Sequence, residues 1–230
     1  MNPKNIREKC YRNSGNLSLI GLLSDPTSGH VLDIGCGNGA NAGILKAQGA
    51  TVDGITISPT ELEEAKVYCD RVALYDLENG LPEEFSNRHA YDLVICSHVL
   101  EHLRYPEKLL GAVRHIIKPN GYLLIALPNI MFYKTRLKLA FGNFDYEENG
   151  LMDQTHYRWF TYRSAQKLLV NAGYKIVRIG ADGGAPLVFM RRLIPSSVAK
   201  RIDNLFVRIR PGLFGVQILV KAQPDSLLWQ

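Results

Sequence analysis

Three glycines on alternate positions follow a short apolar run, and this spacing constrains the fold more than any other feature of the chain. The stretch VLDIGCGNGA spans residues 31–40, with glycines at positions 35, 37 and 39. The apolar run predicts a buried strand. Glycine has no Cβ, so the backbone can turn sharply and a ligand can approach it closely. Because an alanine-containing apolar stretch follows, we expect a strand, a glycine turn and a helix whose N-terminus favours polar or anionic groups. A tight turn without a ligand is the alternative.

Strand-like and helix-like stretches alternate along much of the chain. This predicts an α/β fold with a mostly parallel, doubly wound sheet covered on both faces. Ser58 and Pro59 mark one helix start, as cap and first-turn proline. We expect strands at 31–34, 51–57, 72–75, 91–97, 121–127, 174–179 and 213–221, and helices at 4–23, 39–48, 59–69, 106–117 and 162–172.

Two segments interrupt the alternation. Residues 128–160 are rich in aromatic side chains, and residues 180–212 are rich in basic ones. Irregular segments between regular elements often carry function. We therefore expect a single domain over residues 1–230, with 128–160 as a lid over the substrate and 180–212 as a basic insertion before the last strand.

The net charge belongs to one part of the chain. The 230 residues carry a formal charge of +5, yet residues 191–221 hold seven basic residues and a single acid, Asp203. A local patch of this kind argues against a general nucleic-acid-binding surface. Apolar residues recur at helical spacing between 198 and 209, which predicts a basic amphipathic helix and a weak contact with an anionic membrane through residues 191–210. A helix packed on the sheet, with its basic face in water, is the alternative.

The sequence shows no feature of a targeting or redox segment. No apolar run approaches the ~18 residues that a membrane span needs, and residues 1–16 lack the apolar core of a signal peptide. We therefore expect a cytoplasmic location.

The cysteines form no C-x-x-C pair, so neither a zinc motif nor a redox motif is indicated.

Polar residues stand where four of the expected strands end. Asp33 ends the first strand, Thr56 ends the second, Asp76 follows the third, and Ser97 and His98 end the fourth. In open α/β sheets, ligands bind at the carboxyl ends of the strands. We therefore expect these four ends to form one elongated crevice.

Together, VLDIGCGNGA and DLVICSHVLEHL resemble the first-strand and fourth-strand motifs of the class I S-adenosylmethionine-dependent methyltransferases. The resemblance covers residues 28–128 and implies a seven-stranded Rossmann-like sheet whose last strand is antiparallel. It also implies methyltransferase activity with S-adenosyl-L-methionine as cofactor. By matching position, Asp33 would help to hold the amino group, and Asp76 and Leu77 would flank the adenine. The full set of cofactor-binding residues expected is Tyr11, Asp33, Gly35, Cys36, Gly37, Thr56, Ile57, Asp76, Leu77 and Ser97.

Thr56 departs from the pattern of this family. The family commonly places an acid at this position to hold both ribose hydroxyls, whereas a threonine cannot clamp two hydroxyls as a carboxylate does. The stretch GITIS resembles the cyclopropane-forming branch, which uses the same cofactor. The same threonine argues against a dinucleotide such as NAD, whose sites usually have an acid there.

Residues 150–176 carry a second resemblance. The pattern D-x-T-H-x-R-x-F-T, which begins at Asp153, is similar to that of methyltransferases associated with bacterial polysaccharide and sugar modification. It implies a sugar hydroxyl as methyl acceptor, with Asp153, Tyr157 and Arg158 as substrate-binding residues. A small metabolite such as a quinone precursor or natural product is the alternative acceptor. An inactive cofactor-binding domain is a more remote alternative.

Two histidines are candidates for removing the acceptor's proton. His98 lies at the expected end of the fourth strand, and His156 lies in the segment 128–160. Histidine suits this role because its ordinary pKa lies near neutral pH. Alternatively, His98 contacts the cofactor without proton chemistry, and His156 ties the lid to the sheet.

The pattern H-x-x-E-H at residues 98–102 raises the question of a metal. On a helix, His98, Glu101 and His102 would share one face, and two imidazoles with a carboxylate can bind a divalent ion. The same glutamate–histidine pair also occurs in relatives that bind no metal. We therefore predict that the chain has no metal site.

Overall fold

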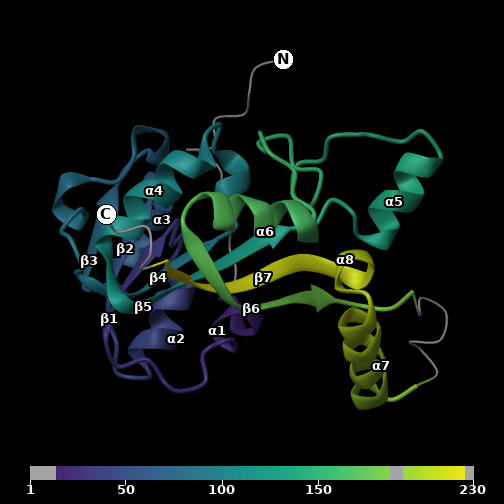
Figure 1. Cartoon of the computed structure of the whole chain (residues 1–230), viewed down its shortest axis with the longest axis horizontal. Coiled ribbons are helices and arrows are strands. Elements are labelled where there is room, and N and C mark those ends of the chain that lie inside the picture. Colours follow the sequence, from purple (N-terminus) through teal and green to yellow (C-terminus); the bar gives the residue numbers. More distant parts are fainter. Residues whose placement is uncertain (1–13, 187–193, 226–230) are drawn as a thin grey trace.

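A seven-stranded mixed sheet forms the centre of the structure (Figure 1), a computed structural model that describes residues 14–186 and 194–225. The strand order is β3-β2-β1-β4-β5-β7-β6, in which β7 runs antiparallel to both of its neighbours and β1 to β5 are parallel. This confirms the expected α/β fold, including the antiparallel last strand. The strands are β1 (His30–Ile34), β2 (Thr51–Thr56), β3 (Arg71–Leu74), β4 (Tyr91–Ser97), β5 (Ile117–Pro128), β6 (Tyr174–Gly183) and β7 (Gly215–Pro224).

Helices cover both faces of this sheet. The apolar side chains of α1, α2 and α3 pack in one cluster with β1 and β2, whereas those of α4 and α6 pack in another with β4, β5 and β7. The α-helices are α1 (Leu17–Ile20), α2 (Ala40–Lys46), α3 (Pro59–Ala65), α4 (Pro106–Ile116), α5 (Tyr133–Ala140), α6 (Tyr162–Asn171), α7 (Ser196–Ile209) and α8 (Pro211–Phe214). Three short 3-10 helices are η2 (Leu77–Asn79), η3 (Glu83–Phe85) and η4 (Leu100–His102).

The expected elements reappear with small differences at their ends. β5 begins at Ile117 rather than 121, because Ile117 pairs with Tyr91 before an irregularity in the register. The helix expected over 4–23 is seen as α1 alone, and residues 4–13 lie outside the described residues. The short helix α5, inside the segment 128–160, was not predicted.

Helix α7 confirms the helix predicted over residues 198–209. Ala199, Asp203 and Val207 are buried, whereas Leu205 and Ile209 are 54% and 63% exposed. The reason is that the helix carries apolar residues on two sides, and the sheet covers only one of them. In the described part of the chain, no helix is both long and apolar enough to cross a membrane.

Candidate active site

The three glycines after β1 adopt the left-handed conformation that the sequence predicts for a tight turn. Gly35, Gly37 and Gly39 have φ angles of 70°, 54° and 83°. Residues with a side chain rarely adopt such angles. At Gly35 a Cβ would also collide with the side chain of Val99. The turn therefore depends on glycine for its conformation and, at Gly35, for space.

Asp33 is a buried carboxylate without a partner. It has no solvent exposure, and neither carboxylate oxygen receives a hydrogen bond. Burial raises the pKa of Asp33 from the ordinary 3.8 to about 7, although the nearby Asn41 side chain lowers it in part. Buried polar groups are almost always paired. An unpaired carboxylate under a glycine turn therefore points to a ligand that carries a donor group.

A second carboxylate lies beside the same turn. Glu61, in the first turn of α3, is 4% exposed, and its Oε1 lies 3.7 Å from the point where a Cβ on Gly37 would stand. Thr56 at the end of β2 donates a hydrogen bond from Oγ1 to Glu61 Oε2 at 3.3 Å. The helix that follows β2 thus places a carboxylate beside the end of that strand.

Sequence reasoning missed Glu61, although a signal was present. Ser58 caps α3 by accepting a hydrogen bond from the backbone N–H of Glu61, at 3.4 Å. A helix that starts at Pro59 places residue 61 in its first turn, next to the strand end that precedes it. The cap therefore located an acid close to Thr56.

The other expected cofactor residues lie at or near the strand ends. Asp76 caps η2 and accepts a hydrogen bond from the backbone of Glu78, at 3.1 Å. Ser97 Oγ accepts one from Asn16 Nδ2 at 3.2 Å. Leu77 and Ile57 are half-buried. Tyr11 lies outside the described residues.

The Cys36 side chain is buried, and its thiol lies 3.7 Å from the Gly37 carbonyl oxygen. A Cβ on Gly54 of β2 would lie 2.8 Å from both the Cys36 and the Cys69 sulfur atoms, so both thiols pack against that strand. Contact with Cys69 and burial raise the pKa of the Cys36 thiol well above its ordinary value. Only the backbone of Cys36 therefore faces a ligand bound at the turn.

His98 donates hydrogen bonds from both ring nitrogens. Nδ1 faces Glu101 Oε1 at 3.2 Å, and Nε2 faces Gln217 Oε1 at 3.0 Å. The same Gln217 oxygen accepts from Asn16, while the Gln217 amide nitrogen donates to Asp182, so the amide orientation is set. An imidazole with two acceptor partners is doubly protonated.

The pKa of His98 agrees with this hydrogen bonding. Burial alone would lower the pKa of His98, but the hydrogen bond and charge of Glu101 outweigh it and raise the pKa. The residue also has a positive φ of 57°, which is uncommon outside glycine. In this arrangement His98 is a cation that can contact a ligand, rather than a group ready to accept a proton.

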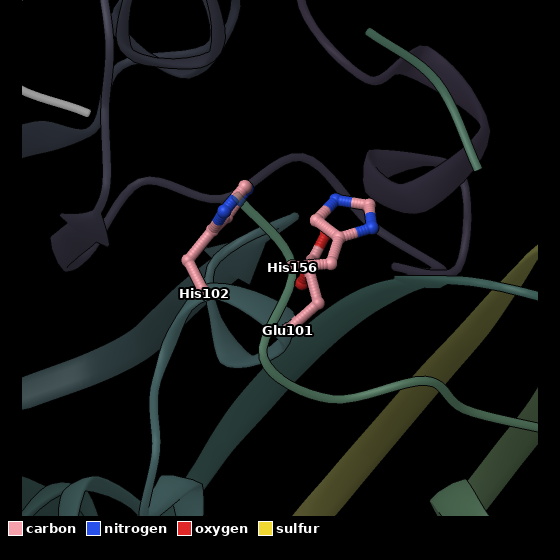
Figure 2. Close-up of side chains that lie close together, drawn as sticks. All are labelled: Glu101, His102 and His156. Carbon is pink, nitrogen blue, oxygen red and sulfur yellow. The ribbon is translucent and has the colours of Figure 1, made fainter. Parts of the chain in front are cut away.

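His156 joins Glu101 and His102 in a buried cluster. Figure 2 shows these side chains close together, with Glu101 and His102 on η4 and His156 on the segment that passes over it. One ligand atom from each residue lies within 4.8 Å of the others. The expectation that His98, Glu101 and His102 share one helix face therefore needs correction. His98 precedes η4 and contacts Glu101 from outside the cluster. The third member of the cluster is His156.

The segment around His156 is fastened to η4 by its own backbone. Tyr157 and Arg158 donate backbone hydrogen bonds to the Glu101 carbonyl, at 2.8 and 3.1 Å. The Arg158 guanidinium donates to the Arg104 carbonyl at 3.0 and 2.6 Å. The Arg158 side chain thus helps to secure this segment, and its expected contact with a substrate stays a prediction.

Asp153 and Tyr157 differ in how accessible they are. Asp153 is 1% exposed, and its Oδ1 accepts from the backbone N–H and the hydroxyl of Thr155, at 2.9 and 2.7 Å. It therefore shapes the turn before His156. Tyr157 is 52% exposed, with the Arg104 guanidinium 5.2 Å from its ring centroid. Of the three expected substrate residues, Tyr157 and Arg158 are exposed, and Asp153 is buried.

Comparison with known proteins decides the class. A family model described as a methyltransferase domain matches residues 7–179. The chain belongs to this methyltransferase family. Its cofactor is S-adenosyl-L-methionine, as the glycine turn and the fourth-strand motif predicted.

Curated relatives of this methyltransferase resemble it over part of their length. A ubiquinone biosynthesis O-methyltransferase of Histophilus somni is 32% identical over 113 residues, which are 46% of this chain and 48% of the relative. That of Rickettsia typhi is 35% identical over 115 residues, or 49% and 44%. The chain thus spans about half the length of the curated relatives it matches.

Solved structures share the fold at low sequence identity. An S-adenosylmethionine-dependent methyltransferase of Archaeoglobus fulgidus superposes with a TM-score of 0.62 at 20% identity, covering 86% of this chain and 87% of its own. The 1,6-didemethyltoxoflavin N1-methyltransferase of Burkholderia thailandensis, solved with S-adenosylhomocysteine, gives 0.55 at 16%, covering 91% and 76%. These likenesses support the fold.

The residues at the turn fit this cofactor. Its methionine part carries an amino group, which can donate to the unpaired oxygens of Asp33. At Gly37, where the atom nearest to a Cβ would be Glu61 Oε1 at 3.7 Å, the backbone is open to close approach. Glu61 and Thr56 offer acceptors that suit ribose hydroxyls.

The raised pKa of Asp33 makes cofactor binding depend on pH. A bound ammonium favours the ionised carboxylate, so binding below pH 7 must release a proton from Asp33. We expect the affinity for S-adenosylhomocysteine to fall about tenfold per pH unit as the pH drops below about 7. Asp33→Asn should bind weakly and without this pH dependence. Calorimetry at several pH values measures both.

The unliganded protein supplies an independent control. Because the folded pKa of Asp33 is raised, its contribution to stability is present below the ordinary value of 3.8 and is lost as the pH rises through about 7. The wild type should therefore lose stability relative to Asp33→Asn over that range. Equal pH profiles of binding and of stability for the two proteins would contradict this account of Asp33.

Proposed function

We propose that the protein is an S-adenosylmethionine-dependent O-methyltransferase whose acceptor is a hydroxyl group on a small aromatic metabolite, of the kind found in quinone precursors. The observation that carries this acceptor class is the match to ubiquinone biosynthesis O-methyltransferases, at 32–35% identity over about half of their length. The match favours the alternative acceptor over the sugar hydroxyl, for which the comparisons give no support. The cytoplasmic location stays a prediction.

The proposed cofactor position follows the strand ends. Asp33 holds the amino group, directly or through one water, and the backbone of Gly35 and Gly37 lies against the methionine part. Glu61, steadied by the hydrogen bond from Thr56, takes the ribose hydroxyls in place of the acid missing from β2.

The remaining expected residues complete the site. Asp76 and Leu77 flank the adenine, and Ser97 lies near the methionine part. The positive charge of His98, beside Ser97, suits the negatively charged carboxylate of the cofactor, although both of its N–H groups donate to Glu101 and Gln217.

The exposed aromatic side chains of the segment 128–160 support an aromatic acceptor. Phe144, Tyr146 and Trp159 form a group with ring centroids 5.9 to 6.1 Å apart. Phe144 and Tyr146 are 47% and 56% exposed, so their outer surfaces can take a further ring. The role of this segment as a lid is part of the same proposal.

Alignment is the main contribution of the protein to methyl transfer. The bound cofactor supplies a methyl group on a positively charged sulfur. The residues at the strand ends hold that end of the site rigidly, and such positioning can account for about 7–11 kcal/mol of a barrier. A phenolic hydroxyl, with an ordinary pKa of about 10, also needs less help in losing its proton than a sugar hydroxyl. Proton removal by His98 or by His156 stays a prediction, and the double-donor arrangement of His98 favours its contact role.

Mass spectrometry of candidate acceptors tests the acceptor class. We expect a catechol or related phenol, incubated with the protein and labelled S-adenosylmethionine, to gain the mass and label of one methyl group. Nucleotide sugars should gain none. Asp33→Asn, assayed at the same concentration, serves as the control for cofactor-dependent transfer. Methylation of nucleotide sugars without methylation of phenols would overturn the proposed acceptor and restore the sugar prediction.

We infer, as a separate proposal about partners, that α7 docks on an anionic membrane surface. Its exposed side carries an apolar stripe formed by Val198, Leu205 and Ile209, which are 40%, 54% and 63% exposed. These positions are spaced by seven and four residues, so they share one face of the helix. Figure 1 shows α7 at one end of the long axis of the molecule, the same end as α5.

The charges on α7 complement an anionic surface. Lys200, Arg201 and Arg208 are exposed, and Arg201 and Arg208 flank the apolar stripe. The helix has one acid, Asp203, which is buried and accepts a hydrogen bond from the Ala185 backbone at 2.8 Å. An interfacial helix has this combination of an apolar stripe and neighbouring cations. Each basic residue near an anionic surface contributes about 1 kcal/mol, so binding should be weak and sensitive to salt.

Vesicle sedimentation tests this surface. The protein should sediment with phosphatidylglycerol-containing vesicles at low salt and not with phosphatidylcholine vesicles. Arg201→Gln with Arg208→Gln should weaken binding about 30-fold, the effect of two charges. The control is Val67→Asp. Val67 is 72% exposed and follows α3, which contacts β3 at the edge of the sheet opposite to β6 and α7, so this variant should bind normally. Absence of binding at low salt, or equal binding by the double variant, would overturn the proposal.

A further inference from the structure

Two buried side-chain atoms in the cluster around η4, one oxygen and one nitrogen, have no hydrogen-bond partner. Glu101 is 1% exposed and His156 is 8% exposed. Glu101 Oε2 and His156 Nδ1 are both shielded from solvent and make no hydrogen bond. Glu101 Oε1 is occupied by His98, so the other oxygen is the one that lacks a partner. A buried carboxylate oxygen and a buried imidazole nitrogen, both unsatisfied and both on residues of one cluster, require an explanation.

The third member of the cluster is held in a defined orientation. His102 Nδ1 lies 3.2 Å from the Thr155 carbonyl and 3.1 Å from the Thr155 hydroxyl. Because that hydroxyl donates to Asp153, both oxygens act as acceptors for an N–H on Nδ1. A histidine that carries its proton on Nδ1 has its lone pair on Nε2. Metal-binding histidines are commonly oriented in this way, with one ring nitrogen donating to a carbonyl or carboxylate.

We propose that Glu101, His102 and His156 bind one divalent transition-metal ion, of the class represented by Zn²⁺ and Co²⁺. Their ligand atoms lie within 4.8 Å of one another. Ligands at bond lengths of about 2.0–2.2 Å lie about 3–3.5 Å apart around one ion, so small side-chain rotations close the site. Two imidazoles and one carboxylate are a donor set that suits these ions and leaves coordination positions for water or another ligand.

The ion would connect two segments that are far apart in the sequence. Glu101 and His102 follow β4, whereas His156 lies in the segment 128–160 that we propose as the lid. The backbone hydrogen bonds from Tyr157 and Arg158 to the Glu101 carbonyl already place the segments in register. Binding of an ion would therefore stabilise the folded protein at this junction, by an amount that grows with the logarithm of the ion concentration divided by its dissociation constant.

Metal binding can be measured independently of methyl transfer. Tag-free full-length protein is treated with a chelator, dialysed, and titrated with Zn²⁺ by equilibrium dialysis and with Co²⁺ by visible absorption. We expect one tightly bound ion per chain, an increase in melting temperature with Zn²⁺, and a Co²⁺ spectrum that indicates nitrogen and oxygen ligands. Because binding requires neither cofactor nor acceptor, its failure would leave the proposed function untouched.

Variants locate the site within the chain. Glu101→Gln and His156→Gln should lose the tight ion, and Thr155→Val, which removes one acceptor from His102, should weaken it about 10–100-fold. His115→Gln, at an exposed histidine on α4, is the matched control and should bind as the wild type does. Circular dichroism confirms that each variant is folded. Absence of tight binding by the wild type, or retention of the ion by both folded ligand variants, would overturn the proposal.

Discussion

The turn after β1 is the constraint on which the rest of this site depends. β1 lies in the middle of the parallel part of the sheet, paired with β2 on one side and β4 on the other. Near its end, neither carboxylate oxygen of Asp33 has a hydrogen-bond partner, and the glycines that follow form a tight turn that only residues without a side chain readily adopt. An unpaired buried carboxylate costs folding free energy unless a ligand with a donor group satisfies it. The turn thus gives up stability in the unliganded protein and gains affinity for an ammonium group.

The ribose side of the site illustrates how one element can supply what another lacks. Thr56 cannot hold two hydroxyls, but its hydroxyl donates to Glu61, which comes from the first turn of α3. The carboxylate reaches the glycine turn because the Ser58 cap fixes where that helix begins. We propose that Glu61, in the first turn of α3, takes the role that the family commonly gives to an acid at the end of β2, with the same cofactor.

The sequence predicted the sheet well because its signals are local. Apolar runs, a proline at a helix start and glycines with positive φ each depend on a few neighbouring residues, and the antiparallel last strand followed from the resemblance to a known family. The cluster around η4 could not be predicted in the same way. His156 reaches Glu101 through backbone hydrogen bonds that join residues more than fifty positions apart, and no spacing rule describes them.

Side-chain roles were the least predictable part. The sequence predicted that Asp153 and Arg158 bind the substrate, yet in the structure both side chains form hydrogen bonds with other residues of the protein. In α7, periodicity identified the helix but not which of its two apolar sides the sheet would cover.

A crystal structure of the protein with S-adenosylhomocysteine is the most direct test of the central claim. We expect the amino nitrogen of S-adenosylhomocysteine to lie within hydrogen-bonding distance of Asp33, or to reach it through one water. We expect both ribose hydroxyls to reach Glu61. The methionine part should lie against the backbone of Gly35 and Gly37. A ligand bound away from the end of β1, or a ribose held without Glu61 while Asp33 keeps no partner, would contradict it.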